Sequence, residues 1–237
     1  MNELALFAGG GGGLLGGKLL GFKTVCYVEH EPYCTEIIKA RIKDGYLDDA
    51  PIWDDAKTFD GYPWAGCVDI VTAGFPCQPF SVAGLQLGES DERNLWPATI
   101  RIIREVGPGL VFLENTPGLL ADPYFGYVLG SLAESGYDCR WDCVPASAIG
   151  ACHQRDRVWI IAHSRSKRLP FGERVLPRGK ETDPSVETFK WWLSEPGMDR
   201  VVDGLAHRVD RIKALGNGQV PGVVKVFWDL MRENRVD

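Results

Sequence analysis

One cysteine stands in the stretch GFPCQPFS, residues 74–81, between two prolines and two aromatic rings. Cys77 directly follows the apolar run VDIVTA, so we expect it on a stiff loop just past the end of a strand. A cysteine at an arbitrary position is usually inert packing. A rigid loop holds a thiol in place, however, and nearby positive charge favours the reactive thiolate. The position therefore predicts a nucleophile.

A carboxylic acid follows a second apolar run, in FLENTPG. At the end of such a strand Glu114 is expected to be partly desolvated, which raises the pKa of a carboxyl. A raised pKa suits a proton donor.

Two arginines alternate in HQRDRVWIIA, at Arg155 and Arg157. Alternate residues of a strand share a face, so the pattern predicts two guanidiniums on one side of a strand and a role in binding an anion.

A glycine loop, FAGGGGGLLGG, follows the first apolar run. Its backbone can approach a ligand closely because no Cβ stands in the way. Read from Gly11, the segment GGGLLG satisfies the dinucleotide fingerprint, and Glu29 follows at the end of the next expected strand, where it could accept hydrogen bonds from ribose hydroxyls. Five glycines in a row satisfy many registers, so the loop supports an adenosine cofactor without separating nicotinamide from S-adenosylmethionine.

Short β-like runs alternate with helical runs through the first two thirds of the chain. Strands are expected at residues 4–8, 24–29, 51–53, 68–74, 110–115, 138–146 and 157–163, and helices at 13–22, 33–45, 95–106 and 124–136. This alternation predicts an α/β fold with a mainly parallel, doubly wound sheet. Ligands bind beyond the carboxyl ends of such strands, and the glycine loop, Glu29, Cys77 and Glu114 all fall there.

The alternation stops at residues 164–211, where prolines and charges replace it, and a glycine turn with an amphipathic terminal helix follows. We therefore expect a catalytic and cofactor-binding domain at 1–163, a small irregular insertion at 164–211, and a turn and helix at 212–237 that pack back on the first domain.

The composition limits the other functions. The chain has seven cysteines without a C-x-x-C pair and four scattered histidines, which favours reduced thiols over disulfides and predicts no metal site. No segment approaches a membrane span, so a soluble, intracellular protein is expected. The net charge of -6 argues mildly against a nucleic-acid partner, but the run from His163 to Lys180 is strongly basic.

Methyl transfer to a pyrimidine carbon requires a thiol, an acid, an anion-binding pair of arginines and a loop that binds an adenosine cofactor, and this chain has candidates for all four. A thiolate that adds to C6, while an acid protonates or hydrogen-bonds N3, converts cytosine to an enamine whose C5 can attack a methyl sulfonium. Loss of the C5 proton and elimination of the thiol then restore the ring.

The chain resembles the DNA (cytosine-5) methyltransferase family, through the ordered motifs FAGGGG, VEHEP, GFPCQPFS, ENT, HQRDR and ALGNGQVP. The resemblance implies an S-adenosylmethionine-dependent, Rossmann-like methyltransferase fold. It also implies methyl transfer from S-adenosyl-L-methionine to C5 of cytosine in double-stranded DNA, through a covalent Cys77–C6 adduct on a flipped-out base. No dimerisation signal stands out, so a monomer of prokaryotic or phage origin is expected.

The resemblance assigns roles residue by residue. Cys77 is the nucleophile and Glu114 the N3 partner, with Asn115 orienting the loop. Arg155 and Arg157 would hold the cysteine loop, the base or its phosphates. The cofactor would contact Phe7, Gly9, Gly11, Glu29, His30, Asp55, Ala56, Pro76, Leu95 and Asn217, with Asp54 as an alternative register for Asp55.

The interval available for reading DNA, within 164–211, is short for this family. The basic run inside it is either a solvated surface or a phosphate contact, and the second is favoured here. Candidates for DNA contact are Gln78, Ser81, Arg165, Lys167, Arg168, Arg174 and Arg178. We expect a recognition site of roughly two to four base pairs and a steep loss of DNA affinity with salt.

Other interpretations stay open from the sequence. A nicotinamide oxidoreductase would explain the glycine loop but leave the cysteine, acid and arginine motifs without a role. An RNA cytosine-5 methyltransferase would use the same chemistry, a regulatory homologue would bind DNA without turnover, and a modified S-adenosylmethionine could replace the usual donor.

Overall fold

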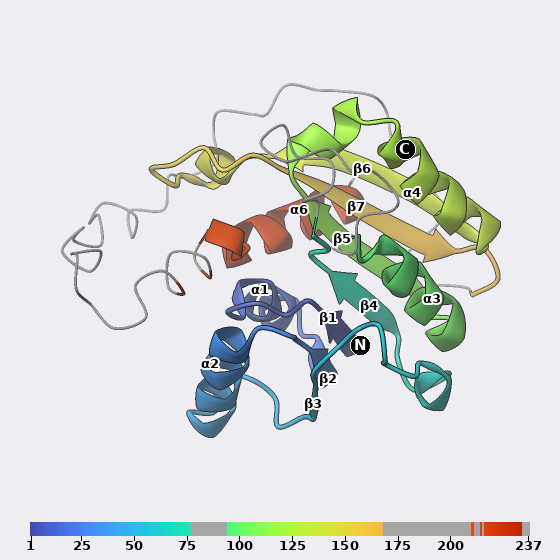
Figure 1. Cartoon of the computed structure of the whole chain (residues 1–237). Helices are drawn as coiled ribbons and strands as arrows, with labels where there is room; N and C mark the ends of the chain where they lie inside the picture. The colour runs from blue at the N-terminus through green and yellow to red at the C-terminus, as the bar shows by residue number, and fades with distance from the viewer. Residues whose placement is uncertain (77–93, 168–209, 211–213, 215, 234–237) are drawn as a thin grey trace.

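The described part of the chain is built around one sheet with helices on both of its faces (Figure 1). The computed structural model describes residues 1–76, 94–167, 210, 214 and 216–233, with side chains up to residue 231. Within these ranges the strands are β1 (Asn2–Leu6), β2 (Lys23–Val28), β3 (Ile52–Trp53), β4 (Ile70–Ala73), β5 (Leu110–Asn115), β6 (Tyr137–Val144) and β7 (Arg157–Ser164). The helices are α1 (Gly12–Leu19), α2 (Pro32–Lys43), α3 (Trp96–Val106), α4 (Tyr124–Glu134) and α6 (Pro221–Glu233), with 3-10 turns at Tyr62–Trp64, Pro117–Ala121 and Ala146–Ile149.

The sheet is mainly parallel, as predicted. Its strands lie in the order β3-β2-β1-β4-β5-β7-β6. The pairs from β3 to β5 are all parallel, and β7 runs antiparallel to both β5 and β6. Each expected strand and helix occurs in the structure with its bounds moved by about three residues or fewer.

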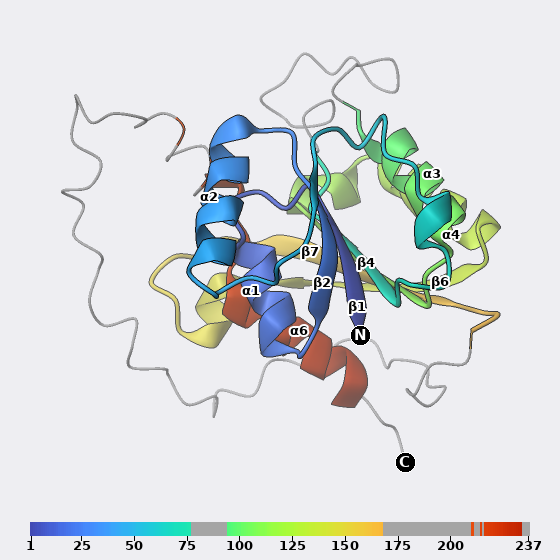
Figure 2. The ribbon, with the colours of Figure 1, turned by 90° about the horizontal axis from the view of Figure 1, so that it is seen from below.

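One face of the sheet is covered by α3 and α4 (Figure 2). The apolar residues of α3 recur every three or four positions at Trp96, Ile100 and Ile103, which places them on one side of the helix. They are buried in one cluster with Val128 and Leu132 of α4. Gly107 ends α3 with a φ of 55°, a left-handed conformation that glycine adopts without strain.

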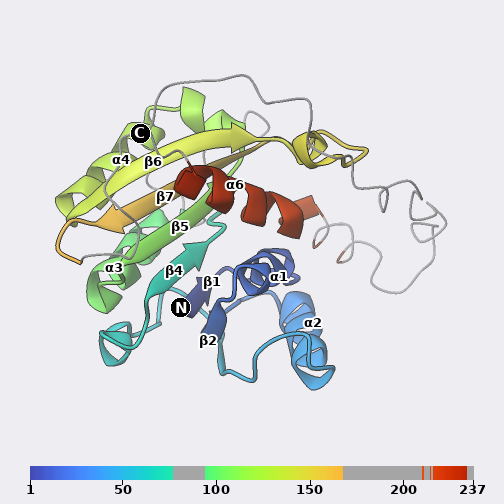
Figure 3. The same ribbon diagram turned by 180° about the vertical axis from the view of Figure 1, so that it is seen from behind.

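The other face is covered by α1, α2 and α6, with α6 beside α1 (Figure 3). Here α6 packs an aromatic cluster on the sheet. The ring of Phe112 lies 5.5 Å from Trp159 and 5.7 Å from Phe227, centre to centre. The edge of its ring also meets Trp228 at 5.8 Å. This cluster holds α6 against the sheet, and residues 216–219 lead directly into that helix.

Parallel registers bring four strand ends to one edge of the sheet. Leu6 pairs with Val28 and with Ala73, and Ala73 pairs with Leu113. The residues just beyond these positions therefore lie side by side at the carboxyl edge. In the part of the chain that the structure describes, no helix has the length and hydropathy needed to cross a membrane.

Candidate active site

A cavity of about 690 Å³ opens at the carboxyl edge of the parallel strands. Its lining comes from the segments after β1, β2, β3, β4 and β5, from Leu95 and Arg157, and from Asp210, Ala214, Gly216 and Asn217. The predicted cofactor residues among them are Phe7, Gly9, Glu29, His30, Asp55, Ala56, Pro76, Leu95 and Asn217. The sequence alone left two registers for the acid after β3, and Asp55, not Asp54, lines the cavity.

Gly11 is the predicted cofactor residue that does not line this cavity. It caps α1 with a φ of 90°, and a Cβ there would face Leu47 and Leu14. Gly11 therefore forms the turn into α1, and its predicted contact with the cofactor stays a prediction.

Glu29 fastens the glycine loop to the end of β2. Its Oε2 accepts a hydrogen bond from the Gly9 amide at 2.6 Å, and its Oε1 accepts one from the Glu31 amide at 2.7 Å. Each carboxylate oxygen has a further lone pair. Glu29 can therefore hold the loop and still accept hydrogen bonds from a ligand in the cavity.

Phe7 directly follows β1 and has a conformation that residues with side chains rarely adopt, with a φ of 54°. Such backbone strain is kept where the surroundings require it, often at functional sites. Next to it, Gly9 also has a positive φ, of 55°. These two turns lead the chain from the buried strand to the rim of the cavity.

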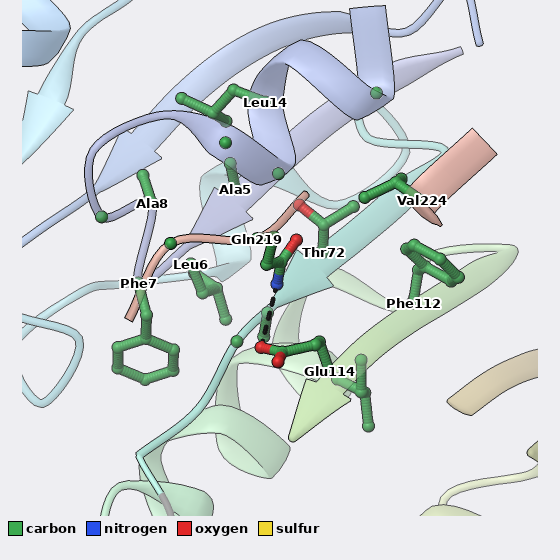
Figure 4. Close-up of a pocket in the computed structure, with 18 of the residues that line it drawn as sticks. Ala5, Leu6, Phe7, Ala8, Leu14, Thr72, Phe112, Glu114, Gln219 and Val224 are labelled. Carbon is green, nitrogen blue, oxygen red and sulfur yellow. Dashed lines mark hydrogen bonds between the residues drawn. The ribbon is translucent and has the colours of Figure 1, made fainter. Parts of the chain in front are cut away.

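Glu114, at the end of β5, is held at both carboxylate oxygens, and Figure 4 shows the contact with Gln219. Arg157 Nε lies 2.8 Å from Oε1, and Gln219 Nε2 donates to Oε2 at 3.2 Å. The residue is only 8% exposed. Burial raises the pKa of Glu114, and the charges of Arg157 and Arg155 and the hydrogen bond from Gln219 oppose part of that rise. The predicted rise in the pKa of this carboxyl is confirmed.

Asn115 ties the end of β5 to the segment before the cysteine loop. Its Nδ2 donates to the Phe75 carbonyl oxygen at 3.0 Å, and its Oδ1 accepts from the Thr116 amide at 2.8 Å. The Phe75 ring packs on Trp96 of α3, with 5.0 Å between ring centres. The last described residues before Cys77 are thus anchored on two sides.

Arg155 and Arg157 do not share one face of a strand, so that prediction was wrong. β7 begins at Arg157, and Arg155 precedes it with a φ of 42°. The backbone turn at Arg155 breaks the alternation on which the prediction depended. Arg155 Nη2 instead donates to the carbonyl oxygens of Gly216, at 2.7 Å, and Gly218, so this arginine holds the 216–219 turn.

Several predicted residues lie outside the described part of the chain. They are Cys77, Gln78, Ser81, Arg168, Arg174 and Arg178.

Arg165 and Lys167 are described and lie at the wrong edge of the sheet for contact near the cavity. β7 runs antiparallel to β5, so its last residue is level with the start of β5 and not with Glu114. Arg165 Nη2 donates to the Ala133 carbonyl oxygen at 2.6 Å, and Lys167 Nζ donates to that of Gly107. The expected DNA contact of these two residues was based on their place in a basic run. It stays a prediction, and the direction of β7 places both residues away from the cavity.

Gln219 is one site residue that the sequence analysis missed. Its place after a glycine turn gives no sign that its side chain reaches Glu114. In the described ranges, no group of three histidine, cysteine or acidic side chains is arranged to hold a metal ion.

Comparison with known proteins gives a consistent family. The model of the C-5 cytosine-specific DNA methylase family matches residues 1–212. The chain is 36% identical over 165 residues to Type II methyltransferase M.NgoMIV of Neisseria gonorrhoeae, which covers 68% of this chain and 51% of that protein. It is also 36% identical over 197 residues to Type II methyltransferase M.CviJI of Paramecium bursaria Chlorella virus IL3A, with 82% and 50% covered.

Solved structures share the fold. A putative DNA modification methyltransferase encoded within an E. coli prophage superposes with a TM-score of 0.58 at 26% identity, over 70% of this chain and 47% of that one. A mutant of Spodoptera frugiperda DNMT2 superposes with a TM-score of 0.59 at 21% identity, over 73% and 53%. These likenesses confirm the predicted methyltransferase fold.

The chain spans about half the length of the curated relatives it matches. The family match nevertheless extends over most of the chain and includes both strand ends that carry Glu29 and Glu114. The chain therefore belongs to the C-5 cytosine-specific DNA methylase family.

Proposed function

We propose that this chain transfers a methyl group from S-adenosyl-L-methionine to C5 of cytosine in double-stranded DNA. The observation that carries the proposal is the position of Glu114. This buried acid, paired with Arg157, borders the same cavity as the glycine loop and Glu29. A proton donor and a nucleoside-binding loop at one cavity are what transfer to a cytosine ring needs.

The cavity fits the proposed cofactor. Its volume of about 690 Å³ lies in the range of roughly 300–1,000 Å³ that is typical of small-molecule sites. Phe7, Pro76 and Leu95 give it apolar walls that suit an adenine ring, while Glu29 offers acceptors for ribose hydroxyls. When bound, S-adenosyl-L-methionine supplies a methyl group attached to a positively charged sulfur.

The chain's own residues would prepare the cytosine. The Cys77 thiolate forms a bond to C6 while Glu114 gives a proton to N3, and the C5=C6 double bond becomes an enamine with a nucleophilic C5. After C5 has been methylated, the C5 proton is lost to a base and the Cys77 thiolate departs. The N3 proton returns to the Glu114 carboxylate, which restores both the neutral aromatic ring and the acid. Arg157, at 2.8 Å from Glu114, would stabilise the carboxylate that remains once Glu114 has given up its proton.

The anchoring of the neighbouring segments supports these roles. Asn115 holds Phe75, two residues before Cys77, against β5. Arg155 holds the turn that contains Asn217, a residue of the cavity lining. Preorganised loops matter because a misplaced reacting group loses much of its catalytic effect.

The target base must leave the duplex, at a cost of about a few kcal/mol. We assign base extrusion and strand contact to Gln78 and Ser81 with the insertion at 164–211, whose candidates are Arg168, Arg174 and Arg178. The catalytic and cofactor-binding domain would then be 1–163, with 212–237 packing back on it.

The proposal is tested by incubating the protein with methyl-labelled S-adenosylmethionine and either duplex DNA or transfer RNA, and by mapping the labelled base. We expect label at C5 of cytosine in DNA, lost by at least about a thousandfold in Cys77→Ala because the nucleophile is removed. Cys67→Ala is the matched control, since Cys67 is exposed and lies away from the cavity. Label in transfer RNA alone would overturn the DNA substrate, and label in neither would overturn the activity.

A second substrate tests the covalent step. DNA with 5-fluorocytosine cannot lose fluorine as a cation, so the thiol cannot depart and a denaturation-resistant complex should accumulate. We expect this complex with the wild-type protein and with Cys67→Ala, and none with Cys77→Ala.

A further inference from the structure

Gln219 enters the candidate active site from the turn that precedes α6. In Figure 4 its side chain points at Glu114, and its Nε2 donates to Oε2 at 3.2 Å. Arg157 occupies the other oxygen of the same carboxyl group, at 2.8 Å. The acid is thus held by one charged and one neutral partner, which come from two separate segments of the chain.

Glycines form the slot in which the Gln219 amide lies. A Cβ on Gly13 would stand 2.3 Å from Gln219 Oε1, and one on Gly74 would stand 2.9 Å from its Nε2. At Gly12 a Cβ would stand 2.2 Å from the Gln219 backbone oxygen. None of these three glycines has the positive φ that would by itself favour glycine. The close approach of Gln219 therefore suffices to explain why these three positions are glycines.

The turn that carries Gln219 is fixed on both sides. Arg155 donates to the carbonyl oxygens of Gly216 and Gly218, immediately before it. After it, Val223 and Val224 are buried in the core under α6. A side chain on such a turn can hold a partner at a defined position, because its own backbone does not move away.

The chemistry of an amide differs from that of the arginine. Arg157 can only donate, and its charge favours the ionised carboxylate. A glutamine amide has a donor and an acceptor at the same end and turns about a bond with two roughly equivalent orientations. It can donate to an ionised carboxylate and accept from a protonated one.

We propose that Gln219 is a positioning residue for Glu114, which keeps the carboxyl group in place in both of its protonation states by turning its amide. The proposal rests on the proposed function, because it gives Glu114 a proton to lose and regain. In each cycle the amide N–H would hold Oε2 after the proton has gone to N3. The amide oxygen would accept the O–H once the proton returns.

Gln219→Met tests this proposal, since methionine has a similar length and no amide. A hydrogen bond to the ionised carboxylate is stronger than the neutral bond that the amide oxygen accepts from the protonated form. Gln219 therefore lowers the pKa of Glu114 on balance, and its loss should raise that pKa. We expect the alkaline limb of the pH–rate profile to move to a pH higher by about 1. The maximal rate should fall by about tenfold, while the KM for S-adenosylmethionine changes by less than about twofold. Lys225→Met is the control, because Lys225 is exposed on α6 and pairs with Asp229.

Gln219→Glu is a second variant. An ionised carboxylate beside Glu114 should move the same limb further up, because like charges disfavour ionisation. If Gln219 only filled the glycine slot, Gln219→Met would lower the melting temperature and leave the limb where it is in the wild type, and only the added charge of Gln219→Glu would move it. That result would overturn the proposal.

The pKa of Glu114 can also be measured by ¹³C NMR of its carboxyl carbon, and this measurement does not depend on enzyme activity. The signal of Glu114 is the one that disappears in Glu114→Gln. Gln219→Met should raise the observed pKa, and an unchanged value would overturn the role of Gln219. A wild-type protein that methylates no nucleic acid would instead overturn the proposed function, so the two failures are distinguishable.

Discussion

Glu3 and Glu114 are two buried acids on the same face of the sheet with different surroundings. Glu3 is 1% exposed and Glu114 is 8% exposed. Glu3 pairs in register with Ile70, Ile70 pairs with Leu110, and alternate residues lead from Leu110 to Glu114 on the same face. Both acids line one small cavity of about 50 Å³, shown in Figure 4. Burial raises the pKa of each.

The two acids differ in their hydrogen-bond and ion-pair partners. The carboxylate of Glu3 accepts hydrogen bonds from the hydroxyls of Thr24, at 2.8 Å, and Thr72, at 2.7 Å. Glu114 has an arginine and an amide, and it also borders the large cavity at the carboxyl edge. A buried acid with a raised pKa is therefore not enough to mark a catalytic group. We propose Glu114 and not Glu3 as the proton donor because Glu114 has a charged partner and borders the large cavity.

The largest expected effect is a difference in kcat between variants of the two acids. Glu114→Gln keeps the shape of the side chain and removes its proton, so kcat should fall by about 10²–10⁴-fold with little change in the KM for S-adenosylmethionine. Glu3→Gln should change kcat by less than about threefold, because Glu3 does not line the large cavity. Steady-state methyl transfer measures both. Equal losses in the two variants would mean that burial, and not the surroundings of Glu114, decides the role.

A smaller effect is expected from one methyl group beside Gln219. In Gly13→Ala the new Cβ would lie 2.3 Å from Gln219 Oε1, so the amide must leave its slot and Glu114 loses one partner. We expect kcat to fall by about tenfold, the size of one hydrogen bond to a charged group.

Gly10→Ala is the matched comparison for this loop. Its Cβ would come no closer than 3.9 Å to Ala214, an ordinary contact, so the loss should be clearly smaller. If both alanines reduced kcat equally, general disturbance of the glycine loop would explain the result and the link to Glu114 would be lost.

The sequence predicted the elements of the fold well because their signals are local. Apolar runs and glycine breaks mark each strand and helix, and the carboxyl-edge position of Glu29 and Glu114 follows from the parallel alternation. The antiparallel direction of β7 had no such signal, since it depends on how β6 and β7 pair at the far side of β5. Arg165 and Lys167 were expected to contact DNA because they belong to a basic run, and their place at the far end of β7 could not be read from that run.

The side-chain contacts of the site were less predictable. The motif pattern led to Glu114 and to both arginines, but not to their partners. A positive φ at Arg155 cannot be read from HQRDR, so its contact with Gly216 and Gly218 was missed. Gln219 was missed because its contact joins residues 105 positions apart in the chain. Such contacts depend on the packing of α6, which is set by tertiary structure.

The smallest expected effect concerns stability, and it tests the interpretation of Glu3 as a structural acid. Its pKa is raised above the ordinary 4.5 in the folded protein. As pH rises above 4.5, the unfolded chain loses the proton first, so the free energy of unfolding should fall until the pH passes the folded-state pKa. A folded-state pKa higher by 1 than the unfolded-state pKa corresponds to a loss of about 1.4 kcal/mol.

Glu3→Gln should flatten this dependence, because its amide does not titrate and the threonine hydroxyls can turn to accept from it. Urea unfolding of both proteins from pH 4.5 to 8 measures the difference. Glu114→Gln should flatten the curve less than Glu3→Gln, since Arg157 already opposes the effect of burial at Glu114. Parallel curves for the wild type and Glu3→Gln would show that Glu3 keeps the same protonation state on unfolding. The two buried acids would then differ in protonation as well as in access to the cavity.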